Sequence, residues 1–349
     1  MIYDYWAAHS FVLESDSRQQ EIINYLLGQG KSAGFPEVPD VSARLELAAQ
    51  AVGTRLKEYA RAGSARQPGG YFALLRQTNN LESYFKGVQA QLQGLGLLPQ
   101  LPDLGGFPAG TFTIHFTFTL KTPYLSKDDS PFQLFDNPMR KEWVFKLPYI
   151  AATQWKGALQ ATMVKQLVTW WQGLSKPSQQ QRKQFVAQRI QLTRLFGTEI
   201  ENVQHYLARC GDNKLEQWYK RYVRRFQSET GFLAGQLYFY PSFFDRLGLE
   251  VINPHDRETG AGTLPIYLEV VPAGATATFT LLYLPTGANT NQAEQNLELV
   301  LNQGIKEMMQ SYGFGAKTSS GYGLATINRQ SLHVQFRQQT ETVVLVKPK

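Results

Sequence analysis

The chain has too few cysteines and histidines to build the common disulfide or metal sites. Its 349 residues hold one cysteine, Cys210, which excludes an internal disulfide and a cysteine-rich zinc site. The five histidines are scattered, and no two of them stand at the spacing of metal ligands. A metallohydrolase activity therefore has no support in the sequence.

The sequence also lacks an apolar run of about 18 residues, the length that a membrane-spanning helix needs. Its first residues do not resemble a secretory signal, so we expect a soluble, cytoplasmic protein with no membrane partner. Basic residues outnumber acidic residues in only one part of the chain. Residues 1–110 carry 9 Lys/Arg and 10 Asp/Glu, whereas the remainder carries 26 and 18. An anionic partner is therefore expected to bind the C-terminal two thirds.

The spacing of apolar residues divides the chain near residue 100. Three stretches of the first part have helical spacing, namely 19–27, 45–59 and 81–92. Asp40 and Asn80 are the expected N-caps of two of these helices. The glycine- and proline-rich stretch 94–110 predicts a linker. We interpret residues 1–105 as a separate helical module that docks to another subunit.

After the linker the apolar period changes from 3.6 residues to two. Residues 111–120 alternate without a fault between apolar side chains and threonine or histidine, which predicts a half-buried strand. Further strands are expected at 235–240, 266–271, 277–284, 332–337 and 342–346, and helices at 154–172, 178–195, 214–226 and 291–311. This order predicts an α+β domain over residues 111–349, with antiparallel strands and a basic helical insertion at 176–230.

A glycine-rich loop, Gly313–Gly323, is the most informative motif. It holds four glycines, one lysine and three adjacent hydroxyl side chains in eleven residues. Free backbone N–H groups in such a loop form a concave anion site, and Lys317 adds a full charge. The order helix, loop, strand is not that of a nucleotide-binding P-loop, in which the strand comes first. The alternative is a tight turn that joins a helix to a strand.

A second segment, 136–159, joins a proline-containing loop to a helix. Thr153 is the expected cap, so Lys156 falls in the first turn, where a lysine is best explained by an anion above the helix end. A solvated surface lysine is the alternative. Asp128, Asp129 and Asp136 precede the helix. Carboxylates there can hold Mg²⁺ or accept a proton from a ribose hydroxyl, or they can simply form turns.

The basic insertion is densest at residues 219–226. Cations interleaved with aromatic rings suit a nucleic-acid strand, with charges on phosphates and rings under bases. The alternative is an amphipathic helix in which Trp218, Tyr222 and Phe226 face the core while the basic face is solvated.

These segments together resemble the RAMP proteins of type III CRISPR-Cas effector complexes. Leu147–Leu159 is similar to the family's PyIPGSSLKGxLR motif, and Arg194–Glu199 with Ala234–Phe239 to its LFG…aGrl.f pair. Val251–His255 with Leu264–Tyr267 resembles a stretch of the terminal RAMP subunit of Cmr complexes, and Gly313–Gly323 the C-terminal glycine-rich signature. Two departures stand out: Ala151-Ala152-Thr153 replaces Pro-Gly-Ser, and Gln160 replaces the final arginine.

The resemblance implies a ferredoxin-like (RRM-like) core with helical insertions and an antiviral role. The implied partners are the guide RNA (crRNA), target RNA, other RAMP subunits and the large polymerase-like subunit. Catalytic RAMP subunits carry an aspartate in a D-[NS]-P context, which Asp136-Asn137-Pro138 matches. The resemblance therefore makes Asp136 the candidate residue for Mg²⁺-dependent endoribonuclease cleavage, with Asp128 and Asp129 as alternatives. Terminal Cmr subunits lack this activity.

Three functions stay open at this point: a non-catalytic guide-RNA scaffold or capping subunit, a backbone subunit that also cuts target RNA, and a free-standing basic RNA-binding protein. The expected RNA contacts are shared by all three. They are Lys156, Lys317, Gly313, Gly315, Thr318, Ser319, Ser320, Gly321, Arg140, Lys141, Lys220, Arg221, Arg224 and Arg225.

Overall fold

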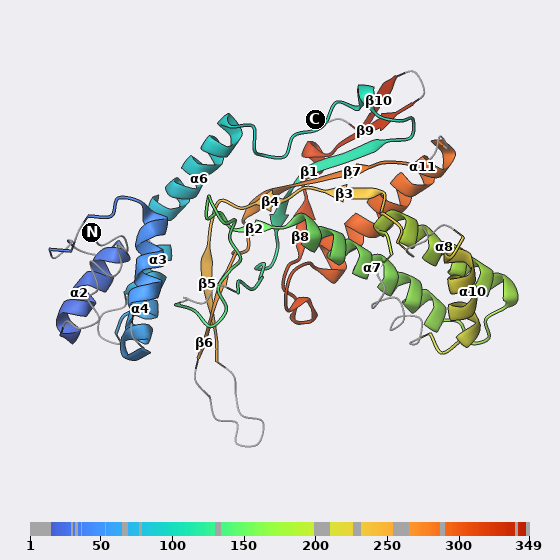
Figure 1. The fold of residues 1–349 in the computed structure, drawn as a ribbon. Coiled ribbons are helices and arrows are strands. Elements are labelled where there is room, and N and C mark those ends of the chain that lie inside the picture. The colour runs from blue at the N-terminus through green and yellow to red at the C-terminus, as the bar shows by residue number, and fades with distance from the viewer. Residues whose placement is uncertain are drawn as a thin grey trace. The chain divides into compact units, whose positions relative to one another are not determined.

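The computed structural model divides the chain into two compact units (Figure 1). The helical unit comprises Met1–Leu98, Thr122–Tyr149 and Phe243–Ala275, and the sheet unit comprises Pro99–Lys121, Ile150–Ser242 and Thr276–Lys349. The structure describes residues 15–28, 31, 34–35, 37–52, 54–64, 69–76, 79–129, 134–198, 210–225, 232–253, 265–286, 290–338 and 341–346. In this described part, none of the helices combines the length and the apolar character needed to cross a bilayer.

The sheet unit is built around one antiparallel sheet of the described strands. Its order is β10 (Thr342–Val346), β9 (His333–Arg337), β1 (Phe112–Leu120), β7 (Thr276–Tyr283) and β3 (Leu237–Phe239), and β8 (Ala325–Ile327) pairs with β1 beyond β9. Figure 1 shows β1 and β7 side by side at the centre. The even-numbered apolar side chains of β1 are all buried, as the alternation predicted. The predicted α+β class is confirmed, while the ferredoxin-like topology stays a prediction.

Helices of the sheet unit follow the predicted ranges closely. They are α7 (Ala152–Gln172), α8 (Gln179–Phe196), α10 (Asn213–Val223) and α11 (Thr290–Glu298), and α11 continues through the π-helical stretches η3 (Leu299–Ile305) and η4 (Met308–Tyr312). One detail differs from the prediction. The N-cap of α7 is Ala151 rather than Thr153, because the Gln154 side chain accepts a hydrogen bond from the Ala151 N–H at 3.1 Å. The helix therefore begins earlier, and Lys156 lies in its second turn.

The helical unit contains α2 (Asp16–Leu26), α3 (Val41–Ala51), η1 (Thr54–Leu56), α4 (Lys57–Ala62), α5 (Gly70–Arg76) and α6 (Asn79–Gly94), together with the hairpin β5 (Gly248–Ile252) and β6 (Ile266–Val270). Asp40 caps α3 as predicted, because its carboxylate accepts the Ala43 N–H at 2.8 Å. Asn80 was the predicted cap of the next helix, but it lies inside α6, which begins at Asn79. The sequence predicted one helix with a continuous apolar stripe over residues 45–59. The structure divides this stretch, because α3 ends at Ala51 and Val52 has an extended backbone.

The N-terminal helices share their compact unit with two later stretches of the chain. Residues 122–149 and 243–275 belong to the same unit, whereas residues 99–105 belong to the sheet unit. The compact unit is therefore assembled from three segments, and the separate module over residues 1–105 stays a proposal. Short elements complete the chain: η2 (Leu104–Gly106), β2 (Tyr149–Ile150), β4 (Ser242–Phe243), which pairs with β2, η5 (Thr318–Ser320) and η6 (Arg329–Ser331).

The core of the sheet unit centres on the buried indole of Trp155 at the start of α7. Its ring centroid lies 5.7 Å from that of Phe118 on β1 and 5.0 Å from that of Phe279 on β7. Both contacts are edge-to-face, the geometry that aromatic pairs favour. The indole N–H donates to the Ser242 hydroxyl at 2.9 Å, so the one polar atom of the side chain is satisfied.

We expect Trp155→Ala to lower the free energy of unfolding by about 3–5 kcal/mol, because a fully buried ring is lost and the surrounding sheet cannot close the cavity. Urea unfolding followed by near-ultraviolet circular dichroism measures this. Phe232→Ala, at a side chain that is 62% exposed, is the control and should change stability by about 0.5 kcal/mol or less. Equal effects of the two substitutions would contradict this description of the core.

Candidate nucleic-acid interface

The glycine-rich loop is anchored at its base and exposed at its tip. Phe314 is 1% exposed, and its ring centroid lies 4.7 Å from that of Trp155 and 5.8 Å from that of Phe118. Across the base, the Phe314 N–H donates to the Gly323 carbonyl at 3.1 Å. Residues 315–317 and 319–321 are exposed. The loop is thus a fixed projection from the core of the sheet unit.

Gly323 makes the closed base of this loop possible. Its φ is +73°, and a Cβ atom at this position would lie 1.9 Å from the Phe314 carbonyl oxygen. Any side chain here would therefore force the two arms of the loop apart. The sequence motif requires glycine at this position for a steric reason that holds whether or not a ligand binds.

At the tip, the chain turns through a left-handed residue. Lys317 has φ +56° and ψ +30°, and its carbonyl accepts the Ser320 N–H at 2.9 Å. No described residue accepts a hydrogen bond from the backbone N–H groups of residues 315–319. The tip therefore presents successive free donors, the Lys317 ammonium group and the Thr318, Ser319 and Ser320 hydroxyls on one short projection, which is what an anion site needs.

The lysine motif packs against this loop. Trp155, whose ring contacts Phe314, is followed directly by the half-exposed Lys156 on α7. Two motifs that stand more than 150 residues apart are thereby joined through one ring contact. Gln160, which replaces the family's final arginine, is 7% exposed and belongs to the core face of α7.

The LFG and AGQL segments meet each other at the end of α8. Gly197 and Ala234 form an antiparallel β-bridge, and a Cβ atom on Gly235 would lie 2.6 Å from the Phe196 carbonyl carbon. Gly197 and Gly235 thus allow the two backbone segments to pass each other at close range. Their role in this structure is packing.

The face of the basic helix α10 that packs against the core is not the face that carries Trp218 and Tyr222. Leu215, Tyr219 and Val223 are buried, whereas Tyr222 is 43% exposed and Trp218 is half-buried. The alternative with Trp218 and Tyr222 in the core is therefore wrong, because the leucine and valine at i−4 and i+4 of Tyr219 make a more apolar stripe. Phe226 lies outside the described residues.

The cations of α10 differ in their surroundings. Lys220 forms an ion pair with Glu216 at 2.6 Å, and the Arg225 guanidinium lies 5.2 Å from the ring centroid of Tyr222. Arg221 and Arg224 are exposed and form no ion pair with a described residue. The helix thus keeps a charged, solvated face that is available to an anion.

In the helical unit, Asp136 is held by two donors. One carboxylate oxygen accepts the Arg61 guanidinium at 2.8 Å and the other accepts the Tyr267 N–H at 3.0 Å. Partial burial raises the pKa of this carboxyl, but the Tyr267 N–H and the Arg61 guanidinium outweigh it, so the pKa lies below its ordinary value. Asp136 is therefore an ionised side chain that ties the loop to α4 and to β6.

The surroundings of Asp136 do not fit a protein-held Mg²⁺ ion. Both of its oxygens are occupied, and the described residues bring together no group of three His, Cys, Asp or Glu side chains. Asp129 is exposed, and Asp128 is half-buried with its N–H donating to the Pro138 carbonyl at 3.0 Å. The three aspartates of the sequence motif therefore do not form a metal site in the described part of the chain.

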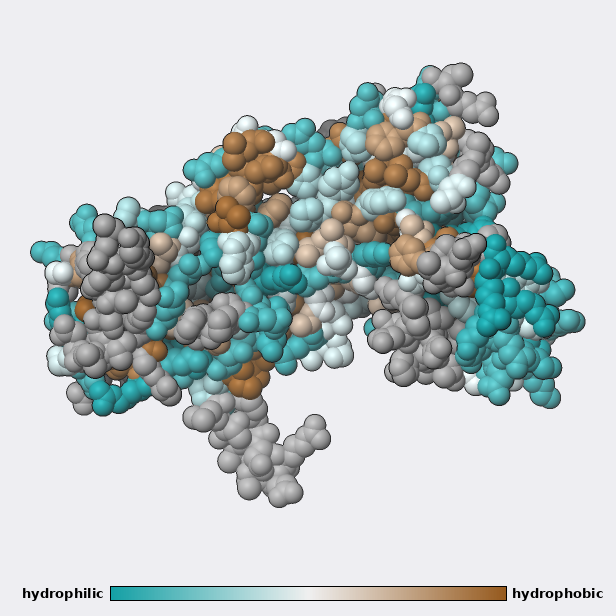
Figure 2. All heavy atoms as spheres, viewed as in Figure 1, coloured by the Kyte–Doolittle hydropathy of each residue, from teal (hydrophilic) through white to brown (hydrophobic). Residues whose placement is uncertain are grey.

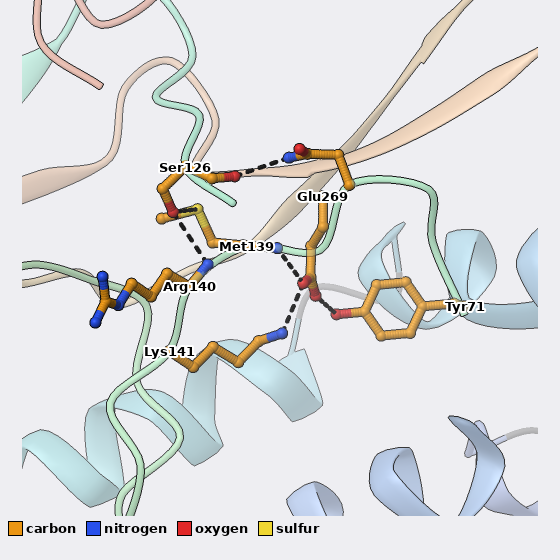
Figure 3. Close-up of polar contacts among 7 residues, drawn as sticks. Tyr71, Ser126, Met139, Arg140, Lys141 and Glu269 are labelled. Atoms are coloured by element: carbon orange, nitrogen blue, oxygen red, sulfur yellow. Dashed lines mark hydrogen bonds and ion pairs between the residues drawn. The ribbon is translucent and has the colours of Figure 1, made fainter. Parts of the chain in front are cut away.

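Lys141 neutralises a buried carboxylate that the sequence did not reveal (Figure 3). Glu269 on β6 is 1% exposed and accepts hydrogen bonds from the Tyr71 hydroxyl at 2.5 Å, the Lys141 ammonium group at 2.6 Å and the Met139 N–H at 2.9 Å. Burial raises the pKa of Tyr71 well above its ordinary value, and the Glu269 charge and hydrogen bond raise it further. Lys141 is thus committed to this network, while the neighbouring Arg140 is exposed and lies 5.9 Å from the Tyr149 ring centroid.

Three residues of these networks escaped sequence reasoning: Arg61, Tyr71 and Glu269. The one signal was a glutamate inside the apolar run 266–271, on a strand whose neighbouring residues are buried. A charged residue at such a position needs a partner. Its partner Tyr71 is 198 positions away in the sequence, so the sequence alone could not supply it.

We expect Gly323→Ala to be more damaging than Gly321→Ala. Both positions have positive φ, which costs an alanine about 1–2 kcal/mol, but only at Gly323 would the new Cβ atom overlap the backbone. Thermal unfolding of the two variants measures the difference. Equal losses of stability would contradict the closed geometry of the loop base.

No protein-family model and no curated protein matches the chain. Among solved structures, one similar chain belongs to the cryo-EM structure of the Type III-B Cmr-beta bound to cognate target RNA. It is 14% identical with a TM-score of 0.38, and the match covers 78% of this chain and 68% of that one. Another is Cmr6 from Pyrococcus furiosus, which is 16% identical with a TM-score of 0.32, and that match covers 62% of this chain and 98% of that one. Both of these structures are of Cmr proteins.

Proposed function

We propose that this chain is an RNA-binding backbone subunit of a type III CRISPR effector complex, in which it holds the guide RNA through its phosphates. The observation that carries the proposal is the contact between Phe314 and Trp155 at 4.7 Å. It seats the glycine-rich loop against the helix that carries Lys156. The two motifs most suited to phosphate binding therefore share one rigid base.

Phosphate binding follows from the groups at this surface. The free N–H groups of residues 315–319 and the three hydroxyls supply donors, and Lys317 and Lys156 supply charge. None of these groups distinguishes one base from another when it binds a phosphate. The subunit therefore holds a guide of any sequence, with target RNA pairing to that guide.

A further part of the proposal concerns neighbouring subunits. Leu95 and Leu97, just after α6, are 66% and 55% exposed, and Figure 2 shows a hydrophobic area at this end of α6. An apolar area of this kind fits contact with another protein. We assign residues 1–105 the docking role, with other RAMP subunits and the large polymerase-like subunit as its partners.

We expect Lys156→Ala and Lys317→Ala each to weaken binding of single-stranded RNA and to lower the slope of log K against log salt by about 0.7, the contribution of one lost phosphate contact. Fluorescence anisotropy with a labelled RNA at several salt concentrations measures this. Lys176→Ala is the matched control, because this exposed lysine follows the far, C-terminal end of α7. Full binding by both variants, or salt-independent binding by the wild type, would refute the phosphate site.

Cleavage of target RNA is the second candidate function. The observation in its favour is that the Asp136 side chain is ionised and 40% exposed despite its two donors. A low pKa makes it a weak general base, so its part would be to orient an attacking 2′-hydroxyl. The ion pair to the buried Arg61 supports a structural role for the same residue, which makes the non-catalytic scaffold the better-supported form of the proposal.

The two roles of Asp136 predict different results. If Asp136 is structural, Asp136→Asn lowers the melting temperature and leaves the cleavage pattern of a guide-matched RNA unchanged in the assembled complex. If it is catalytic, cleavage at one site disappears. Asp129→Asn is the control, because the Asp129 side chain is exposed to solvent. We expect the structural result.

A further inference from the structure

A cleft of about 970 Å³ lies in the sheet unit between α8, α10, the end of β7 and α11. This volume is at the upper end of the range of about 300–1,000 Å³ that is typical of ligand pockets. The glycine-rich loop and Lys156 do not line it. The cleft is therefore a second feature of this unit, separate from the phosphate site proposed above.

The floor of the cleft is a chain of satisfied polar groups. The Asn296 amide, whose residue is 3% exposed, donates to the Tyr283 hydroxyl at 2.9 Å and accepts from the Gln191 amide at 2.8 Å. The three side chains come from α11, β7 and α8, so the floor joins three elements. Burial raises the pKa of Tyr283, against the Asn296 hydrogen bond and the Arg194 charge. A floor of this kind is rigid and polar.

The described lining carries three cations, Lys183, Arg194 and Arg221, and no carboxylate. Lys183 and Arg194 lie on α8 and Arg221 on α10. The two helices are held together by the hydrogen bond between the Thr193 and Tyr219 hydroxyls at 2.9 Å. Lys183 and Arg221 form no ion pair with a described residue, which favours an anionic ligand. Figure 2 shows a strongly hydrophilic surface over α8 and α10.

Aromatic and amide side chains complete the lining. Trp218 and Tyr222 stand four residues apart on α10 and both line the cleft, and Arg225 lies against the Tyr222 ring. The wall also carries several glutamines, whose amides can both donate and accept hydrogen bonds. A simple anion needs only the cations. Rings and amides beside them match a ligand that has a flat base as well as a phosphate.

We propose that this cleft binds an unpaired nucleotide of an RNA strand, with its base stacked on Trp218, its edge facing the glutamines and its phosphate between Lys183 and Arg221. A paired base could not enter, because both of its faces are covered by its neighbours in the duplex. This inference rests on the proposed RNA-binding function and adds a site to it. The strand held at the glycine-rich loop would thereby gain a second contact with the same unit.

The test uses the full chain, a fluorescent ten-nucleotide oligouridylate and a duplex RNA of the same length. We expect Trp218→Ala to weaken oligouridylate binding about tenfold, the effect of losing one stacked base, and to leave duplex binding unchanged. The double variant Lys183→Gln/Arg221→Gln should lower the salt slope by about 0.7, since the contact with one phosphate of a single strand is lost. Lys214→Gln, at an exposed lysine of the same helix that does not line the cleft, is the matched control.

The outcomes separate the cleft from the proposed function. If the cleft variants bind like Lys214→Gln while Lys317→Ala loses affinity, the cleft proposal is wrong and the proposed function stands. If the wild type binds no RNA, both the cleft proposal and the proposed function are wrong. Trp218→Phe keeps a ring and should retain most of the affinity. Loss of binding by that variant, with an unchanged salt slope for the double variant, would point to a packing role for Trp218 and overturn the proposal.

Discussion

The geometry of the sheet unit depends on the burial of one indole ring. Trp155 contacts β1, β7 and the base of the glycine-rich loop, and its N–H has a partner in Ser242. Because a buried indole must both fill its cavity and satisfy its donor, these elements have little freedom to shift relative to one another. The tip of the glycine-rich loop is held in place by the same contacts, because Phe314 at the loop base packs against Trp155. A short loop with several glycines would otherwise lose much conformational entropy when it closed on a ligand.

The helical unit depends in the same way on a buried charge. Glu269 is removed from water and would be very costly there without its three donors. Those donors come from α5 and from the loop that precedes β2, so the carboxylate joins segments that are far apart in the chain. This explains why the N-terminal helices share a compact unit with later stretches. A module made only of the first 105 residues would leave Glu269 without Tyr71.

The distribution of charge shows which cations are available to a partner. Lys141 and Lys220 are paired with carboxylates, whereas Lys156, Lys317 and Arg221 form no ion pair with a described residue. The charges of Lys141 and Lys220 are neutralised within the protein, so these lysines are less available to a phosphate. The other three cations stay solvated and can release counterions when a phosphate binds. Lys317 lies at the loop tip, Lys156 lies on the helix that packs against the base of the loop, and Arg221 lines the cleft beside α10. Both the loop and the cleft suit a strand of RNA.

Much of the architecture was predictable because local periodicity reports directly on burial. The faultless alternation of residues 111–120 became the central strand β1, and the helical periods became α7, α8 and α10 within a few residues. The glycine loop was identified because its composition is unusual. Its neighbours in the sequence also specified its type, since a helix before it and a strand after it excluded a P-loop.

What the sequence by itself determined were therefore the element types, the α+β class and the position of the loop. Tertiary structure alone decided which partners the polar side chains found. Asp136 pairs with Arg61, and Glu269 accepts hydrogen bonds from Lys141 and Tyr71. Tertiary structure also placed Arg221 in a cleft. It also decided which face of α10 was buried. The physical reason is that these contacts join residues that are tens to hundreds of positions apart. Periodicity describes the two faces of one element, but a partner is chosen only when different elements pack together.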